Sequence, residues 1–223
     1  MKIGIVYIVA TPIGNLEDFS FRALKILKNV DLILAEDTRK TKILLDRYKI
    51  KKPLISYHQH TKSQKIEEII IKIKSGQKTA FVTDAGTPGI NDPGIGLVSR
   101  LLQEKEISII PVPGSCAATT LLSISGFPSD KFLFFGFLPK KKGRRTFFNN
   151  LKNLFISTIV FYESPYRIKK TLLEIQNFLG DNEIVVGREL TKKFETIYRG
   201  KISQVLPQIK PKGEFTIAMK LKK

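Results

Sequence analysis

Two hydrophobic periods alternate along the first half of the chain, and this alternation limits the possible folds more than any other feature. Short apolar runs that predict buried strands lie at 3–10, 31–36, 54–58, 78–83 and 107–112. Segments with helical spacing separate them, at 19–30, 38–49, 61–76 and 92–105. Strands that alternate with helices are typical of α/β units around a largely parallel sheet.

The helical segments carry recognisable start and stop signals. In 61–76, isoleucines recur at the i, i+3, i+4, i+7 spacing of one helical face, and Gly76 stands where a C-terminal glycine is favoured. Ser20 predicts an N-cap for a helix at 19–30 that places Phe21, Leu24 and Leu27 on one face. Asp92 and Pro93 predict the start of the helix at 92–105.

The pattern changes after residue 112, and we expect two α/β domains, 1–112 and 113–223. In the second domain, the apolar runs at 182–190, 193–200 and 213–221 lie close together without long helices between them. Such spacing predicts antiparallel pairing within a mixed sheet.

Three loops rich in glycine or proline follow three of the predicted strands. They are ATPIGNLED (10–18), the loop within VTDAGTPGINDPG (82–94), and PVPGSCAA (111–118). Ligands of parallel α/β folds bind beyond the carboxyl ends of the strands. Glycine permits positive φ and lets a ligand approach the backbone. We therefore expect the three loops to converge on one binding site.

Other common sites are not indicated. The chain lacks a P-loop, and GIGLVS (94–99) is interpreted as a helix start rather than a dinucleotide fingerprint, because Ser99 replaces the third glycine. His58 and His60 have no further metal ligands at suitable spacing, so no metal is expected. One cysteine, no run as long as a membrane span and no signal-peptide cleavage site together predict a cytoplasmic protein.

The balance of charge points to an anionic partner. The formal net charge is +18, and the segment 139–152 holds six basic residues and no acidic one. A cationic surface of this kind is typical of nucleic-acid binding. A Lys-rich composition throughout the chain is the competing explanation.

Ordered motifs carry a resemblance to a known family. VATPIGNLED, LAEDTRKT, VTDAGTPGINDPG, VPG, GFLP, FYESPYR and RELTKKFETIYRG resemble the bacterial 16S ribosomal RNA (cytidine-2′-O)-methyltransferases of the tetrapyrrole-methylase superfamily. The resemblance covers nearly the whole chain. It implies two α/β domains with S-adenosylmethionine (SAM) in the cleft between them, a homodimer, and ribose 2′-O-methylation of a cytidine in the decoding region of the small ribosomal subunit.

The resemblance also implies site residues. The cofactor contacts it indicates, including one in the first loop, are Pro12, Asp84, Gly86, Thr87, Pro88, Ile90, Ser115, Cys116 and Tyr162. Relatives often have proline where this chain has Ser115. Many relatives also continue into a C-terminal helical region that we expect to be absent here, which leaves the mode of RNA docking open.

Several carboxylates are candidates for the catalytic base. Glu36 and Asp37 follow the strand at 31–36, while Glu163 and Glu189 are rivals from the second domain. Helix caps or ion pairs are the alternative roles for each. The expected RNA contacts are Arg39, Lys141, Lys142, Arg144, Arg145, Arg188 and Lys192, with 140–145 acting as a mobile arm.

Two other functions compete with rRNA methylation. A tetrapyrrole methylase of the same fold would act on a small molecule, which needs fewer basic residues than this chain has. A ribosome-binding factor without catalytic activity would not need three loops suited to a cofactor.

Overall fold

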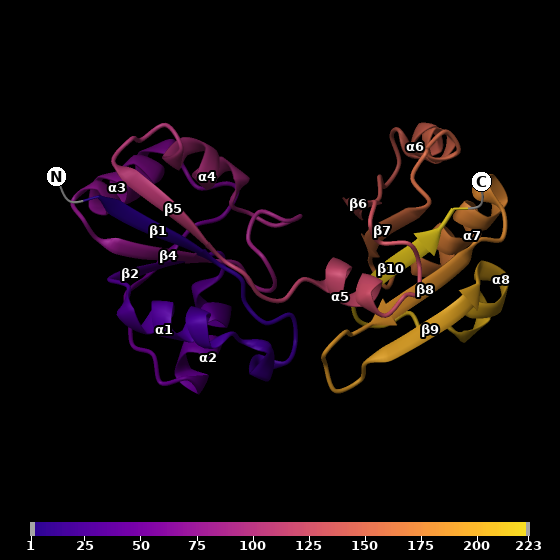
Figure 1. Ribbon diagram of the computed structural model, residues 1–223, viewed down its shortest axis with the longest axis horizontal. Helices are drawn as coiled ribbons and strands as arrows, with labels where there is room; N and C mark the ends of the chain where they lie inside the picture. The colour runs from indigo at the N-terminus through magenta and orange to yellow at the C-terminus, as the bar shows by residue number, and fades with distance from the viewer. Residues whose placement is uncertain (1–2, 222–223) are drawn as a thin grey trace. The chain divides into compact units, whose positions relative to one another are not determined.

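The chain folds into two compact units, Met1–Cys116 and Ala117–Lys223. Each is seen in Figure 1, which is drawn from a computed structural model that describes residues 3–221. Val112, the boundary predicted from the sequence, is the last residue of strand β5 in the first unit. Each unit contains one five-stranded sheet.

The first sheet is parallel throughout, as the alternating pattern predicts. Its strands are β1 (Gly4–Val9), β2 (Leu32–Ala35), β3 (Leu54–Ser56), β4 (Lys78–Val82) and β5 (Ile107–Val112). They pair in the order β3-β2-β4-β1-β5, with every pair parallel. The strands that precede the three glycine- and proline-rich loops, β1, β4 and β5, are therefore neighbours.

Helices cover both faces of this sheet (Figure 1). The helices are α1 (Phe21–Asn29), α2 (Thr38–Arg47), α3 (Ser63–Lys74) and α4 (Ile95–Leu101), with a short 3-10 turn at Leu16–Asp18. Alternation along β2 divides the core. Ile33 packs toward α1 and α2, while Leu34 packs toward α3 and α4.

Local signals in the sequence predict some of these helices correctly. The Ser20 hydroxyl accepts the Ala23 amide hydrogen bond at 3.1 Å, and Gly76 adopts φ +95° after α3. The shared face predicted for Phe21, Leu24 and Leu27 is only partly present. Phe21 is 92% exposed, while Leu27 is buried together with Ala23 and Leu24 is partly buried.

The predicted start of α4 is also wrong. Pro93 does not begin the helix, because its carbonyl accepts the Gly89 amide and closes the preceding loop. The helix begins at Ile95, after Gly94 at φ +135°. A Cβ at Gly94 would lie 2.8 Å from the Phe81 ring, so both the backbone angle and the space require glycine.

The second sheet is mixed, which confirms the antiparallel pairing expected near the C-terminus. Its strands are β6 (Phe132–Phe137), β7 (Thr158–Glu163), β8 (Glu183–Arg188), β9 (Thr196–Lys201) and β10 (Phe215–Lys220). They run in the order β6-β7-β10-β8-β9, and only β6 and β7 pair in parallel.

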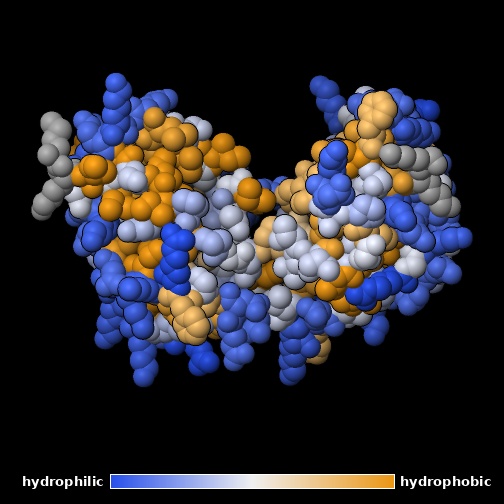
Figure 2. Space-filling view, viewed as in Figure 1, coloured by the Kyte–Doolittle hydropathy of each residue, from blue (hydrophilic) through white to orange (hydrophobic). Residues whose placement is uncertain are grey.

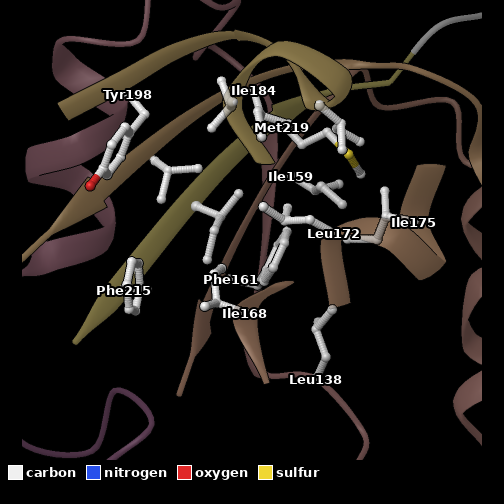
Figure 3. Close-up of a cluster of buried hydrophobic side chains, with 14 of the residues drawn as sticks. Leu138, Ile159, Phe161, Ile168, Leu172, Ile175, Ile184, Tyr198, Phe215 and Met219 are labelled. Atoms are coloured by element: carbon white, nitrogen blue, oxygen red, sulfur yellow. The ribbon is translucent and has the colours of Figure 1, made fainter. Parts of the chain in front are cut away.

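The core of the second unit lies on one face of this sheet (Figure 3). Three helices supply its outer layer: α6 (Arg144–Leu151), α7 (Ile168–Leu179) and α8 (Ile202–Val205), the last continued by a 3-10 turn at Leu206–Gln208. Helix α5 (Ala117–Ser123) packs against β7, β8 and β10. A Cβ at Gly187 would lie 2.9 Å from Leu121, so glycine lets α5 approach β8 closely.

Candidate functional site

The three loops rich in glycine and proline meet at the carboxyl ends of β1, β4 and β5. Thr11 and Gly86 form an isolated antiparallel bridge, with amide-to-carbonyl distances of 2.9 and 3.0 Å. The Thr87 hydroxyl donates to the Ser115 carbonyl at 3.2 Å. These hydrogen bonds join all three loops within the first unit, so the convergence expected from the sequence is present.

The middle loop holds its shape through left-handed backbone. Gly86 and Gly89 have φ of +80° and +82°. A Cβ on Gly86 would lie 3.5 Å from Ile13 and 3.7 Å from the Ser115 carbonyl, which is ordinary contact. The backbone angle, rather than space within the chain, therefore favours glycine at this position. Pro12 and Pro88 are buried beside it.

Donor groups of the middle loop are left for a ligand. Within residues 3–221, the amides of Ala85 and Thr87, which flank Gly86, donate to no acceptor of the chain. Successive backbone amides around a left-handed residue form concavities that suit anionic groups. Ile90, at the far side of the loop, has a side chain that is 46% exposed.

Carboxylates tie the end of β2 to the end of β4. The Asp84 amide donates to Oε2 of Glu36 at 3.3 Å, and the Asp37 amide donates to Oδ1 of Asp84 at 3.1 Å. Lys40 places its ammonium 2.7 Å from Oδ2 of Asp84. Asp84 is therefore committed to holding the two strand ends together.

Asp37 is a helix cap. Its carboxylate accepts the Arg39 amide at the start of α2 and pairs with the Arg39 guanidinium at 2.7 Å. Hydrogen bonds from Arg39 hold the pKa of Asp37 well below its usual range. Because such a carboxylate resists protonation, Asp37 is poorly suited to accept a proton. The Arg39 side chain is itself 88% exposed.

Asp92 is a residue that reasoning from the sequence misses, because its position before Pro93 suggests a helix start. Burial raises the pKa of its carboxyl from 3.8 to about 6, and the negative charges of Glu36 and Asp84 contribute to this rise. A carboxyl with such a pKa, beside a ligand-shaped loop, is a candidate for proton transfer. The position of Asp92 at the end of a glycine-rich loop is the sequence signal by which it could have been identified as a candidate site residue.

Glu163 belongs to a buried network in the second unit. Its carboxylate accepts hydrogen bonds from the Ser164 amide, Arg167 and Thr171 at 2.7–2.9 Å, and its side chain is fully buried. These contacts connect the end of β7 to the start of α7, which is a structural role. The adjacent Tyr162 packs its ring against Phe134 and Phe137.

The basic stretch is anchored at one end rather than free throughout. Arg144 begins α6 and donates to Glu174, the Pro139 carbonyl and Thr171 at 2.6–2.7 Å. Its guanidinium is therefore engaged inside the second unit. Lys141, Lys142 and Arg145 are exposed, and none of them forms a salt bridge within the described part of the chain.

The two basic residues expected near β9 are also engaged in the fold. Arg188 donates to the Lys212 carbonyl at 2.6 Å and to the Phe194 carbonyl at 3.1 Å. Lys192 pairs with Glu189 at 3.1 Å and with Glu214 at 2.9 Å. Both residues stabilise the connection between β8 and β9, and Glu189 is paired in the same way.

The remaining candidates lie at the entry to α5 and after β3. Ser115 and Cys116 are partly buried just before Ala117, and Cys116 forms no disulfide. The His58 and His60 rings lie 6.3 Å apart. Over the described residues, no group of three or more His, Cys, Asp or Glu side chains is arranged to hold a metal ion.

Comparisons with known proteins agree with this arrangement. Residues 5–206 match the family described as Tetrapyrrole (Corrin/Porphyrin) Methylases. The chain is 47% identical to ribosomal RNA small subunit methyltransferase I of Thermotoga maritima, over 97% of this chain and 98% of that protein. The chain belongs to the ribosomal RNA small subunit methyltransferase I group of the tetrapyrrole methylases.

Other members of this methyltransferase group are similarly close. The proteins of the same name from Bacillus subtilis and Escherichia coli O157:H7 are each 46% identical, over 97% and 96% of this chain and over 75% and 77% of their own lengths. The family predicted from the sequence motifs is thus confirmed.

Solved structures of tetrapyrrole methylases and related enzymes share the fold. A cobalt precorrin-4 methyltransferase matches with a TM-score of 0.72 at 17% identity, covering 97% of this chain and 94% of that one. A diphthine synthase matches with a TM-score of 0.71 at 10% identity, covering 98% and 90%. In residues 3–221 no helix is long and apolar enough to cross a bilayer.

Proposed function

We propose that the protein transfers a methyl group from SAM to the ribose 2′-hydroxyl of a cytidine in the decoding region of 16S ribosomal RNA. The observation that carries this proposal is the 47% identity, over almost the full length of both chains, to a ribosomal RNA small subunit methyltransferase. The three joined loops of the first unit supply the cofactor site that such an activity needs.

The residues of the loops fit this cofactor. SAM carries a carboxylate and an ammonium group on its amino-acid part, and hydroxyls on its ribose. The amides of Ala85 and Thr87 would meet the carboxylate, because they surround the left-handed Gly86 and donate to no acceptor among the described residues. Ser115, Cys116 and the exposed Ile90 would complete the contacts from the neighbouring loops and the loop end. Tyr162 and Pro12 remain proposed contacts by family resemblance.

When bound, SAM supplies a methyl group activated on a sulfonium centre, so the protein mainly has to hold the ribose oxygen in line and exclude water. Among the candidate bases named from the sequence, Asp37, Glu163 and Glu189 are held in ion pairs. Glu36, whose carboxylate accepts the Asp84 amide at the end of β2, is the base we retain, and Asp92 is its rival. Glu36→Gln and Asp92→Asn, compared for methyl-transfer rate at saturating SAM, distinguish the two, since only removal of the base lowers that rate by about 100-fold or more.

The RNA would be held by cations whose side chains are exposed. Figure 2 shows hydrophilic residues projecting from both units. Lys141, Lys142 and Arg145 are exposed at the start of α6, and we propose that they contact phosphates. Arg39 is added to this set because its side chain is almost fully exposed. We leave out Arg144, Arg188 and Lys192, whose charged groups are bound within the second unit.

We further propose that the protein is a cytoplasmic homodimer, in line with the family resemblance. Sedimentation at micromolar concentration measures the oligomeric state directly, and a monomer at all concentrations would refute the dimer.

The decisive experiment supplies purified protein with labelled SAM and small ribosomal subunits that lack the modification. Mass mapping of the digested RNA should find one methylated ribose on a cytidine, formed faster on assembled subunits than on bare RNA. Gly86→Val, at a SAM concentration that is limiting for wild type, serves as the matched protein with weakened cofactor binding. Labelling of a tetrapyrrole without labelling of RNA would instead support the small-molecule methylase.

A salt series tests the phosphate contacts. Replacing Lys141, Lys142 and Arg145 by Ala should reduce the salt dependence of binding to small subunits, by about 0.9 in log–log slope for each duplex phosphate that is no longer neutralised. The control removes the same charge from α1, through Arg22→Ala, Lys25→Ala and Lys28→Ala, all on exposed residues. Equal effects in both triple variants would show that only net charge matters.

A further inference from the structure

An open pocket of about 480 Å³ lies in the second unit, beside the connection between β8 and β9. We call it the β8–β9 pocket. Its volume is within the range of small-ligand sites. The side chains that matter for its chemistry are Arg188, Lys193, Phe194, Glu195, Tyr198 and Lys210. Three are cationic and one is acidic, so the lining is positive, and two are aromatic.

Phe194 is the unusual member of this pocket. Its side chain is 66% exposed, although burying a phenyl ring is normally favourable. Its backbone is nevertheless fixed, because Arg188 donates to the Phe194 carbonyl at 3.1 Å and to the Lys212 carbonyl at 2.6 Å. An exposed aromatic ring on a backbone held by such hydrogen bonds is the arrangement that stacking surfaces use.

Backbone hydrogen bonds and ion pairs stabilise the connection between β8 and β9, which carries Phe194. The Lys192 amide donates to Glu189 and the Glu195 amide donates to Lys192, each at 3.0 Å. The Lys192 ammonium joins Glu189 to Glu214. Glu189 adopts φ +53°, a left-handed conformation that a non-glycine residue keeps only when its surroundings fix it. Little ordering would therefore be needed when a ligand binds to the ring.

Free positive charge lies around the exposed ring. The Lys193 ammonium lies over the Phe194 ring, 5.7 Å from its centroid, as a cation–π contact. Lys193 and Lys210 are exposed, and neither forms a salt bridge to another residue in 3–221. An exposed aromatic ring with one cation over it and a second exposed cation in the same pocket matches a nucleotide, which has a flat base and an anionic phosphate.

We propose that the β8–β9 pocket binds one unpaired nucleotide of an RNA substrate, with its base stacked on Phe194 and its phosphate between Lys193 and Lys210. The proposal rests on the proposed function, because rRNA is the anion that the protein must dock. It assigns these RNA contacts to the second unit, whereas the loops that would hold SAM belong to the first unit. Charge complementarity favours RNA over a second copy of this chain, which has a formal charge of +18 itself.

Tryptophan fluorescence provides the direct test, since the chain contains no tryptophan. Phe194→Trp places a single reporter at the pocket. Titration with a short single-stranded oligocytidylate should quench this reporter as the base stacks on it. Phe155→Trp is the matched control, because Phe155 is 94% exposed in the same unit but outside the pocket. Equal quenching of the two reporters, or quenching of neither, would overturn the proposal.

Affinity measurements complete the test. Phe194→Ala should weaken binding of the oligonucleotide and of small subunits by about 5- to 150-fold, while SAM affinity and the thermal midpoint stay unchanged. Lys193→Ala combined with Lys210→Ala should lower the salt slope by about 0.7 for each phosphate that is no longer neutralised. The paired control is Lys169→Ala with Lys170→Ala, two exposed lysines on α7.

The outcomes separate this inference from the proposed function. If wild type methylates rRNA and Phe194→Ala binds RNA as tightly as wild type does, the inference about the β8–β9 pocket is overturned and the proposed function stands. Wild-type protein that methylates no rRNA would overturn the proposed function, and the quenching titration would still decide whether the pocket binds single-stranded RNA. If Phe194→Ala changes the sedimentation state but not RNA affinity, the pocket is a contact between copies and the inference fails.

Discussion

Asp92→Asn should make the protein more stable at neutral pH. The carboxyl is partly buried, and its pKa of about 6 compares with an ordinary value of 3.8. Each unit of pKa difference corresponds to about 1.4 kcal/mol, so ionised Asp92 costs the folded state at most about 3 kcal/mol. Screening by solvent reduces this, and we expect a gain of about 1–2 kcal/mol from the neutral amide.

The sign of the pH dependence follows from the raised pKa. Below about pH 3 the acid is mostly protonated in both the folded and the unfolded chain, so wild type and Asp92→Asn should have similar stability. Between about pH 4 and pH 6 the unfolded chain releases the proton while the folded chain keeps it, so wild-type stability falls as pH rises. Above about pH 6.5 the difference should remain constant.

Urea denaturation followed by circular dichroism, at pH values from 4.5 to 8, measures this difference. Asp130→Asn is the control, because Asp130 is exposed and forms no salt bridge in the described chain. An Asp92 carboxyl that titrates near pH 4 by NMR, together with equal urea midpoints for variant and wild type at pH 7.5, would refute the reasoning.

Two further substitutions test other parts of the structure. Glu163→Ala removes the fully buried partner of Arg167 and should destabilise the second unit by about 3–5 kcal/mol, seen as a lower thermal midpoint, with SAM affinity retained. An unchanged midpoint would contradict the structural role of this acid. Gly86→Ala should cost about 1–2 kcal/mol of stability through its positive φ alone. Gly86→Val should also lower SAM affinity by about 10- to 100-fold in calorimetry, and a folded variant that binds SAM normally would rule out the loop as the cofactor site.

The sequence predicts much of the first unit because its signals are local. The strand pattern, the Ser20 cap and the glycine after α3 each depend on residues a few positions apart. Convergence of the three loops also follows, because the carboxyl ends of parallel strands lie at one edge of the sheet. Phe21 is misplaced because helical spacing alone does not say which of two adjacent apolar stripes faces the sheet.

The roles of charged side chains cannot be predicted in this way. Arg144 and Glu174 are 30 positions apart, and only the packing of α6 on α7 brings them together. Lys40 and Asp84 are 44 positions apart and meet only because β2 and β4 pair. A basic residue in a basic stretch has the same appearance in sequence whether its charge is free or paired. Only the fold therefore separates Arg144, whose guanidinium is bound, from Arg145 beside it, whose side chain is exposed.

Several unfavourable features gather in the loop between β4 and α4. Asn91 is left-handed at φ +59°, and Asp92 is a carboxyl with a raised pKa. Ile90 is 46% exposed, and Ile95, which begins α4 just after the loop, is 66% exposed. Each costs free energy that a simple turn between a strand and a helix would avoid. These free-energy costs cluster in one loop, and two other loops are hydrogen-bonded to it. The clustering indicates that the segment is shaped for a bound ligand rather than for stability. A cofactor that covered the isoleucines and used the amides around Gly86 would recover part of this cost, so SAM should raise the thermal midpoint of wild type more than that of Gly86→Val.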